Sequence, residues 1–248
     1  MSGAPGDPAH AAHAAHAALH WTRIGTARFL DTCAAFDEAA FDARTALPGW
    51  TRRHLVAHVA ANADALGNLV RWAATGEPTP MYASADERRA GIERGATMTG
   101  AELTAWATRS AATLAAGLDA LTARQWAHDV VTAQGRVLPA GEIPWLRARE
   151  VCVHAVDLAA GVGFAAFPAD FLERLAAEAV DRHDARTTPA VALTATDLDA
   201  ARTWRLAGPG EPAAIRAPLA DITAYLTGRV ATLPTASGAP APELPAWL

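Results

Sequence analysis

The sequence predicts an α+β protein, with a four-helix bundle in the N-terminal part and a small domain of mixed helices and strands after it. Before residue 165, four long segments repeat apolar residues at spacings of three and four, the period of an amphipathic helix. After Pro168, short alternating runs bounded by glycine and proline indicate strands. The chain has 248 residues, 51% of them hydrophobic, which suits one large or two smaller domains and excludes wholesale disorder.

The bundle helices are expected at residues 21–46, 51–75, 99–121 and 144–160. Thr51 is suited to the N-cap of the second helix, and Pro144 to the first turn of the fourth. A polar, glycine-broken segment at 79–100, with a helical turn or two at 84–94, separates the second helix from the third. Residues 122–141 are expected to form a loop or short hairpin, which gives the bundle one long crossover.

The small domain is expected to contain a helix, three strands and a last helix, at 169–183, 190–196, 202–207, 213–216 and 218–231. These roughly 70 residues are too few for a doubly wound sheet but sufficient for a second domain. The predicted boundaries assign residues 1–19 to a disordered or fraying leader, 20–165 to the bundle, 166–233 to the α+β domain and 234–248 to a Pro/Ala-rich tail.

The leader carries His10, His13, His16 and His20, which form a stripe at helical spacing. One interpretation is a tail that binds metal. The other, which the alanine-rich composition favours, is the start of a helix with solvated histidines.

Composition excludes several classes of function. The chain has 21 basic residues, all arginine, and 26 acidic residues, so its net charge of −5 argues against a nucleic-acid-binding protein. Two cysteines, Cys33 and Cys152, cannot form a disulfide framework, which favours a reducing compartment. No signal peptide and no apolar run of about 18 residues is visible. We therefore expect a soluble cytoplasmic protein, a monomer by default, with no membrane partner.

The helix expected at 144–160 contains a candidate metal-binding pair. At about 100° per residue, Glu150 and His154 lie about 40° apart on one partly apolar stripe, while Cys152 lies about 200° from Glu150 and is not expected to be a ligand. Burying both groups unpaired is costly, and a divalent metal removes that cost. Alternatively, Glu150 pairs with an arginine and His154 is a core histidine. Asp157 or Asn62 would orient an imidazole in a metal site.

The helix expected at 51–75 offers a third ligand. His58 lies at the border of its apolar face, about 100° from the centre, whereas His54 lies about 140° away and is expected to point toward solvent. His58, Glu150 and His154 would give two histidines and one glutamate with an open position. That composition is typical of catalytic zinc, because structural zinc sites fill all four positions and favour cysteine.

Three segments together resemble a known family. They are LPGWTRRHLVAHVAANADAL at 47–66, IPWLRAREVCVHAVDL at 143–158 and YLTGR at 225–229. In this combination the chain resembles the mycothiol-dependent maleylpyruvate isomerase family, a branch of the DinB-like four-helix metalloproteins, over roughly residues 20–231. The resemblance implies zinc held by His58, Glu150 and His154, a sterol-carrier-like C-terminal domain, and a role in activity for Arg229. One departure is Tyr225, where many members have tryptophan.

The resemblance also implies a reaction. A zinc ion with an open position binds a thiol as thiolate, so mycothiol would add to the cis double bond of maleylpyruvate. Rotation about the new single bond and elimination would release the trans isomer, fumarylpyruvate. Arg229 would hold a carboxylate or stabilise the transient enolate, although a solvated arginine at a helix end is equally compatible with the sequence alone. Arg147 and Arg149 are expected to be surface charges or anion anchors.

Two other functions fit the same residues. One is a mycothiol S-transferase, which would use the same metal and thiol to modify another small electrophile. The other is a non-catalytic module, in which the second domain binds an apolar ligand and the bundle is structural. The first would consume the thiol, and the second would not require the metal.

Overall fold

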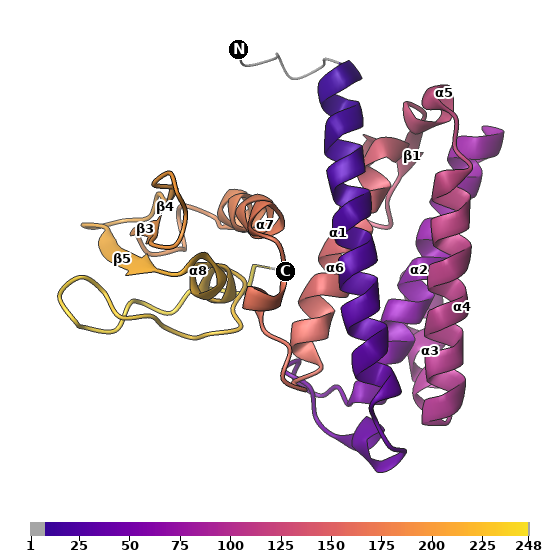
Figure 1. Cartoon of the computed structure of the whole chain (residues 1–248), viewed down its shortest axis with the longest axis horizontal. Helices are drawn as coiled ribbons and strands as arrows, with labels where there is room; N and C mark the ends of the chain where they lie inside the picture. Colours follow the sequence, from indigo (N-terminus) through magenta and orange to yellow (C-terminus); the bar gives the residue numbers. More distant parts are fainter. Residues whose placement is uncertain (1–7, 248) are drawn as a thin grey trace. The chain divides into compact units, whose positions relative to one another are not determined.

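The computed structural model describes residues 8–247, with side chains from residue 15 onward. The chain divides into two compact units, residues 1–162 and 163–248. The first is a helical bundle and the second contains a small sheet (Figure 1), which confirms the predicted α+β fold class. Among the described residues, no helix is both long and apolar enough to cross a bilayer.

Four long helices form the first unit: α1 (Pro8–Ala34), α2 (Arg52–Thr75), α4 (Gly100–Asp119) and α6 (Ile143–Asp157). Helix α1 packs on α6, and α2 packs on both α4 and α6. The apolar face of α2 is buried throughout; it comprises Leu55, Val59, Ala63, Leu66 and Val70. The apolar faces of the helices therefore pack together into one bundle core.

Helix α1 differs from its prediction at both ends. It begins at Pro8, within the segment expected to be a leader, because the alanine-rich stretch has high helix propensity. It ends at Ala34 rather than near Ala46, and a 3₁₀ helix, η1 (Ala39–Asp42), follows. Asp37 accepts a hydrogen bond from the Ala40 N–H, a local bond that favours a new turn over a continuing helix.

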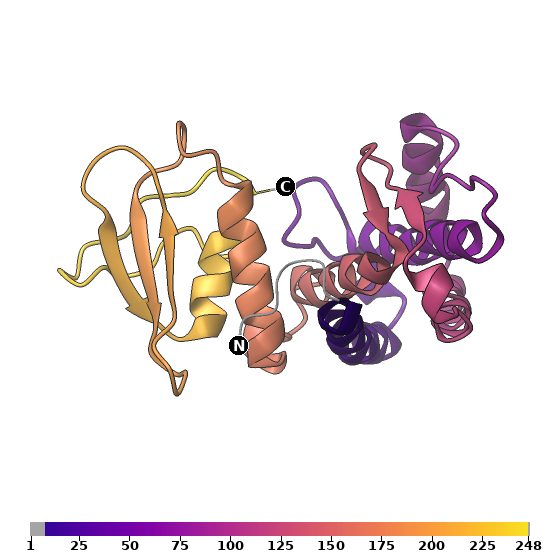
Figure 2. The same ribbon diagram turned by 90° about the horizontal axis from the view of Figure 1, so that it is seen from above.

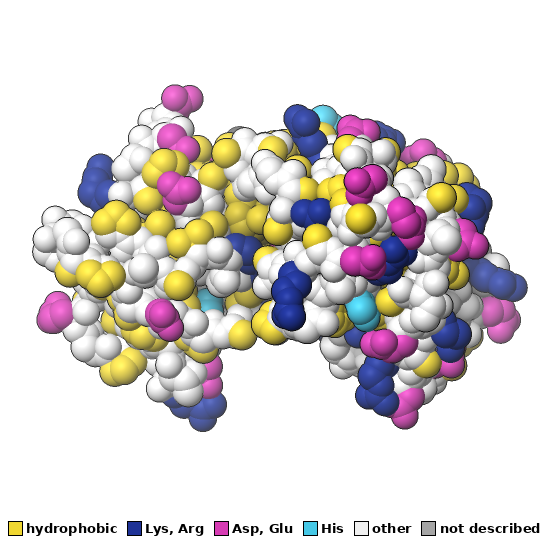
Figure 3. Space-filling view, turned by 90° about the horizontal axis from the view of Figure 1, so that it is seen from below, with side chains coloured by type: hydrophobic (Ala, Val, Ile, Leu, Met, Phe, Trp, Pro, Cys, Tyr) yellow, Lys and Arg dark blue, Asp and Glu magenta, His cyan; other side chains and the backbone are white. Residues whose placement is uncertain are grey.

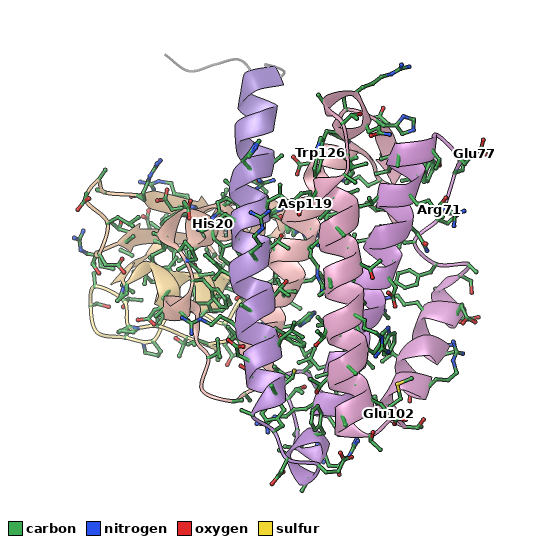
Figure 4. All side chains as sticks on the ribbon, turned by 45° about the vertical axis from the view of Figure 1, so that its right-hand side comes forward. His20, Arg71, Glu77, Glu102, Asp119 and Trp126 are labelled. Atoms are coloured by element: carbon green, nitrogen blue, oxygen red, sulfur yellow. The ribbon has the colours of Figure 1, made fainter. Side chains whose placement is uncertain are left out.

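Part of the histidine stripe lies outside the described side chains. This holds for His10 and His13, while residues 1–7 are not described at all. His20, labelled on α1 in Figure 4, is exposed to solvent. Figure 3 shows arginine and acidic side chains interspersed on the visible face of the first unit, so this face is not a continuous basic surface.

Two connections of the bundle contain short elements. Between α2 and α4 lies α3 (Ala85–Ala96), whose N-cap Ser84 accepts a hydrogen bond from the Glu87 N–H. Between α4 and α6 lie α5 (Ala123–Trp126), the strands β1 (Asp129–Val131) and β2 (Val137–Pro139), and η2 (Ala140–Glu142). The two strands pair antiparallel. Of the loop or short hairpin predicted for this segment, the structure therefore has the hairpin. Helix α6 starts with Pro144 in its first turn, as predicted.

The second unit contains η3 (Phe164–Ala166), α7 (Ala169–Arg182), β3 (Val191–Ala195), β4 (Thr203–Leu206), β5 (Ala213–Ala217) and α8 (Leu219–Leu226). The sheet order is β4-β3-β5, with β4 antiparallel and β5 parallel to β3. Both helices lie on one side of the sheet (Figure 2). Alternate residues of β3 are buried, namely Val191, Leu193 and Ala195, so this face of the sheet carries the core.

The end of the chain belongs to the second unit, although the sequence suggested a separate tail. The Ala236 N–H donates to the carbonyl of Ala214 in β5, and Ala241 and Trp247 are buried. The Tyr225 hydroxyl donates to the Pro242 carbonyl. Proline-rich sequence therefore packs here through single hydrogen bonds and apolar contacts rather than through regular structure.

Helix α8 ends at Leu226, five residues before the predicted end, for a reason visible in the backbone. Gly228 adopts φ 72°, the left-handed conformation that glycine tolerates best. The N–H groups of Gly228 and Arg229 donate to the carbonyls of Tyr225 and Ala224, which is the Schellman pattern of helix termination. The YLTGR segment thus ends the helix and places Arg229 directly after the turn.

Candidate metal centre

The start of α2 is fastened to the end of α6. Arg52 donates hydrogen bonds from Nε to the Leu158 carbonyl at 2.9 Å and from Nη2 to the Ala159 carbonyl at 3.0 Å. The Leu158 carbonyl, at the C-cap of α6, is one that a helix C-terminus leaves without an intrahelical partner, and the Ala159 carbonyl follows it. A cation there also complements the helix dipole. This contact fixes the register between the two helices that carry the predicted ligands.

His54 caps α2 and contributes no ligand. Its Nδ1 lies 2.8 Å from the hydroxyl of Thr51, the predicted N-cap, and 3.3 Å from the Thr51 backbone N. The ring also stacks on Trp50. His54 is half-buried and held by these contacts, whereas the sequence predicted that it points toward solvent. The reason is local, because a histidine at the third helical position can reach back to the N-cap.

The structure brings together the three residues that the sequence pattern selected. His58 on α2 and Glu150 and His154 on α6 each offer a ligand atom, and these atoms lie within 4.8 Å of one another. Glu150 Oε2 lies 3.1 Å from His58 Nε2 and 3.3 Å from His154 Nε2. Two imidazoles and a carboxylate directed at one point match the ligand set of catalytic zinc. The donor set thus fits the metal that the resemblance implied.

Electrostatics keep the carboxylate ionised. Burial by itself would raise the pKa of Glu150, but hydrogen bonds from His154 and His58 outweigh it and hold that pKa well below its usual range. Burial lowers the pKa of His58, against the opposing effect of Glu150. Burial also opposes charge on His154, yet hydrogen bonds to Asp157 and Glu150 raise its pKa to about 9. A metal requires an ionised glutamate, which this site provides, and neutral imidazoles, so metal binding would displace a proton from His154.

Asp157 orients one of the imidazoles. Its side chain is fully buried, and its Oδ2 lies 2.9 Å from His154 Nδ1. A proton held on Nδ1 by this carboxylate leaves Nε2 directed at Glu150. The sequence offered Asp157 and Asn62 as alternatives for this task, and the contact with an imidazole is made by Asp157.

Asn62 instead binds Arg147, whose burial contradicts the predicted alternative of a surface charge. The Arg147 side chain is buried, and its Nη1 donates to the Val59 carbonyl at 2.8 Å and to Asn62 Oδ1 at 2.9 Å. Burial lowers the pKa of Arg147 to about 10. Its Nε has no hydrogen-bond partner among the described residues. Arg147 is thus a polar link between α6 and α2 beside the metal ligands.

Cys152 lies on the opposite side of α6, as its helical angle predicted. Its Sγ lies 3.8 Å from the Trp21 carbonyl of α1, and a Cβ placed on Gly25 would come within 2.5 Å of the same sulfur. Neither Cys152 nor Cys33 belongs to the ligand cluster, and both are buried. The chain's own thiols are therefore not among the candidate ligands.

A small cavity of about 90 Å³ adjoins the cluster. It is lined by His58, Asn62, Leu66, Met81, Tyr82, Arg88, Thr132, Ala133, Gln134, Leu146, Arg149 and Glu150. Sequence reasoning missed Tyr82 and Arg88, because residues 79–100 carry no apolar period from which a facing direction can be read. The tip of the β1–β2 hairpin supplies residues 132–134 of the lining, so the crossover helps to enclose the site.

Arg229, the residue predicted to act in turnover, belongs to the second unit. Its Nη1 donates to the Thr227 carbonyl at 2.6 Å, directly after the end of α8. Its part in the reaction stays a prediction.

Comparisons with known proteins agree with this architecture. Residues 22–159 match the protein family described as "Mycothiol maleylpyruvate isomerase N-terminal domain". A crystal structure of the mycothiol-dependent maleylpyruvate isomerase is similar with a TM-score of 0.83 and 36% identity, covering 94% of this chain and 97% of that one. A variant of that protein with a histidine replaced by alanine gives a TM-score of 0.82, with the same identity and coverage. No curated protein sequence matches the chain.

Proposed function

The chain belongs to the mycothiol-dependent maleylpyruvate isomerase family, and on that premise we propose that it is a zinc- and mycothiol-dependent cis–trans isomerase of maleylpyruvate or a close analogue. One observation carries the proposal within the chain itself. Ligand atoms of His58, Glu150 and His154 lie within 4.8 Å of one another on two packed helices. Because this is a set of three protein ligands without cysteine, it favours a catalytic over a structural metal.

The cofactors divide the chemistry between them. A divalent ion held by His58, Glu150 and His154 would supply the positive charge that keeps a thiol ionised near neutral pH. Mycothiol would supply the nucleophile whose addition converts the double bond into a single bond that can rotate. The residues of the chain position these groups. Asp157 fixes the ring of His154, and Arg147 and Arg52 hold α2 and α6 in register.

The state of the cysteines supports an external thiol. Cys33 and Cys152 are each 1% exposed. Burial raises the pKa of Cys33 to about 12 and also raises that of Cys152. Because the nucleophile must be an accessible thiolate, neither residue suits the reaction at neutral pH.

Arg229 is proposed to act on the substrate rather than on the metal. A guanidinium can bind a carboxylate through two parallel hydrogen bonds and can stabilise the negative charge of an enolate. The Schellman turn at Gly228 gives Arg229 a defined backbone position after α8. We assign it the role of an anion-binding residue in turnover.

The test combines metal analysis with a balance of the thiol. The purified full chain should contain about one zinc per molecule and isomerise maleylpyruvate only when mycothiol is present, leaving the mycothiol concentration unchanged. Stoichiometric loss of mycothiol would instead identify an S-transferase. A zinc-loaded chain that leaves maleylpyruvate unchanged with mycothiol present would overturn the proposal.

A further inference from the structure

The cavity beside the metal ligands contains more arginines than carboxylates. Among its described lining residues Glu150 is the one carboxylate, and the lining also contains two arginines, Arg88 and Arg149. A divalent cation held by the ligands would add further positive charge. A polar cavity with this balance favours an anionic ligand. Its volume of about 90 Å³ is below that of a typical small-molecule pocket, so it suits one end of a ligand rather than the whole.

Arg88 contacts one of the proposed metal ligands directly. It lies on α3, which packs on α2, and its Nη2 is 3.3 Å from His58 Nδ1. Its Cζ lies 5.9 Å from the centre of the Tyr82 ring, another side chain of the cavity wall. Arg88 is half-buried, so its guanidinium is partly shielded from water.

This contact determines where the proton of His58 sits. A guanidinium carries hydrogen-bond donors and no acceptor, so His58 Nδ1 must be the acceptor. The ring proton is then on Nε2, which donates to Glu150 Oε2 at 3.1 Å. The three groups form a chain in which Arg88 donates to His58 and His58 donates to Glu150.

Metal binding is incompatible with that chain. A histidine binds a metal through a nitrogen lone pair, so a metal on Nε2 requires the ring proton on Nδ1. The donor on Nδ1 would then face the donors of Arg88. Arg88 would then lose its acceptor on His58 while keeping its interaction with the Tyr82 side chain. The Nη2 donor would therefore be available to an acceptor on a ligand in the cavity.

We infer that Arg88 is a substrate-binding residue whose guanidinium moves from His58 to a carboxylate of the ligand when the metal is bound. This assignment rests on the proposed function in one respect, because the substrate of that reaction carries carboxylates. The ligands that the site recognises would be small dicarboxylates, with one carboxylate bound in the cavity beside the metal ligands. The long Arg88 side chain and the adjacent Tyr82 ring provide the cavity wall against which that end of the ligand would rest.

The neighbouring residue provides a matched control. Arg89 lies on the same helix, is exposed, and pairs with Asp86 at 2.8 Å. Replacing either arginine by glutamine removes one positive charge from α3. Any long-range electrostatic effect should therefore be similar for R88Q and R89Q, and a specific contact should appear only in R88Q.

The experiment measures binding of maleate to the full chain by titration calorimetry, with and without zinc and in the absence of thiol. In the zinc-loaded protein, R88Q should weaken maleate binding about tenfold or more, whereas R89Q should change it less than about twofold. Without zinc, where Arg88 donates to His58, the R88Q effect should largely disappear. Zinc content should be the same in R88Q, R89Q and the unmodified chain.

Three results would overturn the inference. The first is an equal effect of R88Q and R89Q on maleate affinity, and the second is an R88Q effect that is the same with and without zinc. The third is loss of zinc from R88Q, which would make Arg88 a support for His58. Because no turnover is measured, these outcomes are separate from the isomerase assay, and either proposal can fail alone.

Discussion

His58 Nε2 and Glu150 Oε2 lie 3.1 Å apart although 92 residues separate them in the sequence. The contact exists because α2 and α6 pack against each other and Arg52 fixes their register. His154, one turn after Glu150, brings its Nε2 within 3.3 Å of the same carboxylate.

The three ligands are expected to be individually necessary. His58→Ala, Glu150→Ala and His154→Ala should each reduce zinc to near zero after dialysis and abolish thiol-dependent isomerisation, since two remaining ligands hold the ion weakly. Metal analysis and circular dichroism on the same samples check both retention and folding. His20→Ala, which removes an exposed histidine of α1, is the control and should keep full zinc. A ligand variant that is folded and retains zinc would contradict the assignment.

Asp157 should affect metal affinity without being a ligand. Asp157→Asn keeps a side chain of similar shape but removes the negative charge that faces His154. Zinc affinity should therefore fall about 10- to 100-fold. Competition with a zinc chelator of known affinity measures the change. Affinity equal to that of the unmodified chain would mean that His154 is oriented by its packing alone.

Replacing Arg229 should reduce turnover without reducing zinc content, unlike replacing a metal ligand. Arg229→Ala is expected to keep one zinc per chain and lose turnover, because it removes an anion-binding group and no ligand. Arg229→Lys should recover part of the activity, since the charge returns without the two parallel hydrogen bonds. Parallel zinc analysis and kinetics provide the readout. Loss of zinc in Arg229→Ala would be incompatible with this division.

The cysteines should be inert in the native protein. The pKa of Cys33 at about 12 lies far above neutrality, and the raised pKa of Cys152 acts in the same direction, so both remain neutral thiols at pH 8. An aromatic disulfide reagent should therefore detect no thiol in the folded chain and two after denaturation. Cys152→Ser should retain most activity. A rapidly reacting native cysteine would mean that its surroundings open readily.

Arg147 should be important for stability. Arg147→Ala would remove the hydrogen bonds to Val59 and Asn62 and leave a buried cavity, lowering the free energy of unfolding by about 2–4 kcal/mol. Chemical denaturation of the metal-free chain measures this value without a contribution from zinc. Arg109→Ala, an exposed arginine on α4, should change it by less than about 0.5 kcal/mol. Equal values for the two variants would show that the buried link contributes little.

Local pattern predicted most of the fold because helix periodicity and end signals are properties of neighbouring residues. Thr51 and Pro144 marked helix starts, and the spacing of Glu150 and His154 placed them on one face. The end of α1 was predicted too late because Phe41 continues the apolar spacing of the helix. Phe41 is in fact part of the 3₁₀ helix η1, from which its side chain reaches the core. The early end of α8 depends on the left-handed backbone conformation of Gly228, which the sequence alone does not reveal.

The surroundings of the site could not be predicted in the same way. Arg147 is buried where Asn62 and the Val59 carbonyl of another helix accept its hydrogen bonds. Arg88 reaches His58 from a segment without an apolar period. Both contacts are set by how helices pack, and a single sequence records no such pairing.

The central claim is that His58, Glu150 and His154 hold one metal with a position left for sulfur. X-ray absorption at the zinc edge of the loaded full chain tests it most directly. We predict scattering from two imidazoles with nitrogen or oxygen ligands at about 2.0–2.2 Å, and one sulfur at about 2.3 Å after mycothiol is added. A spectrum without imidazole scattering, or one unchanged by mycothiol, would contradict the claim.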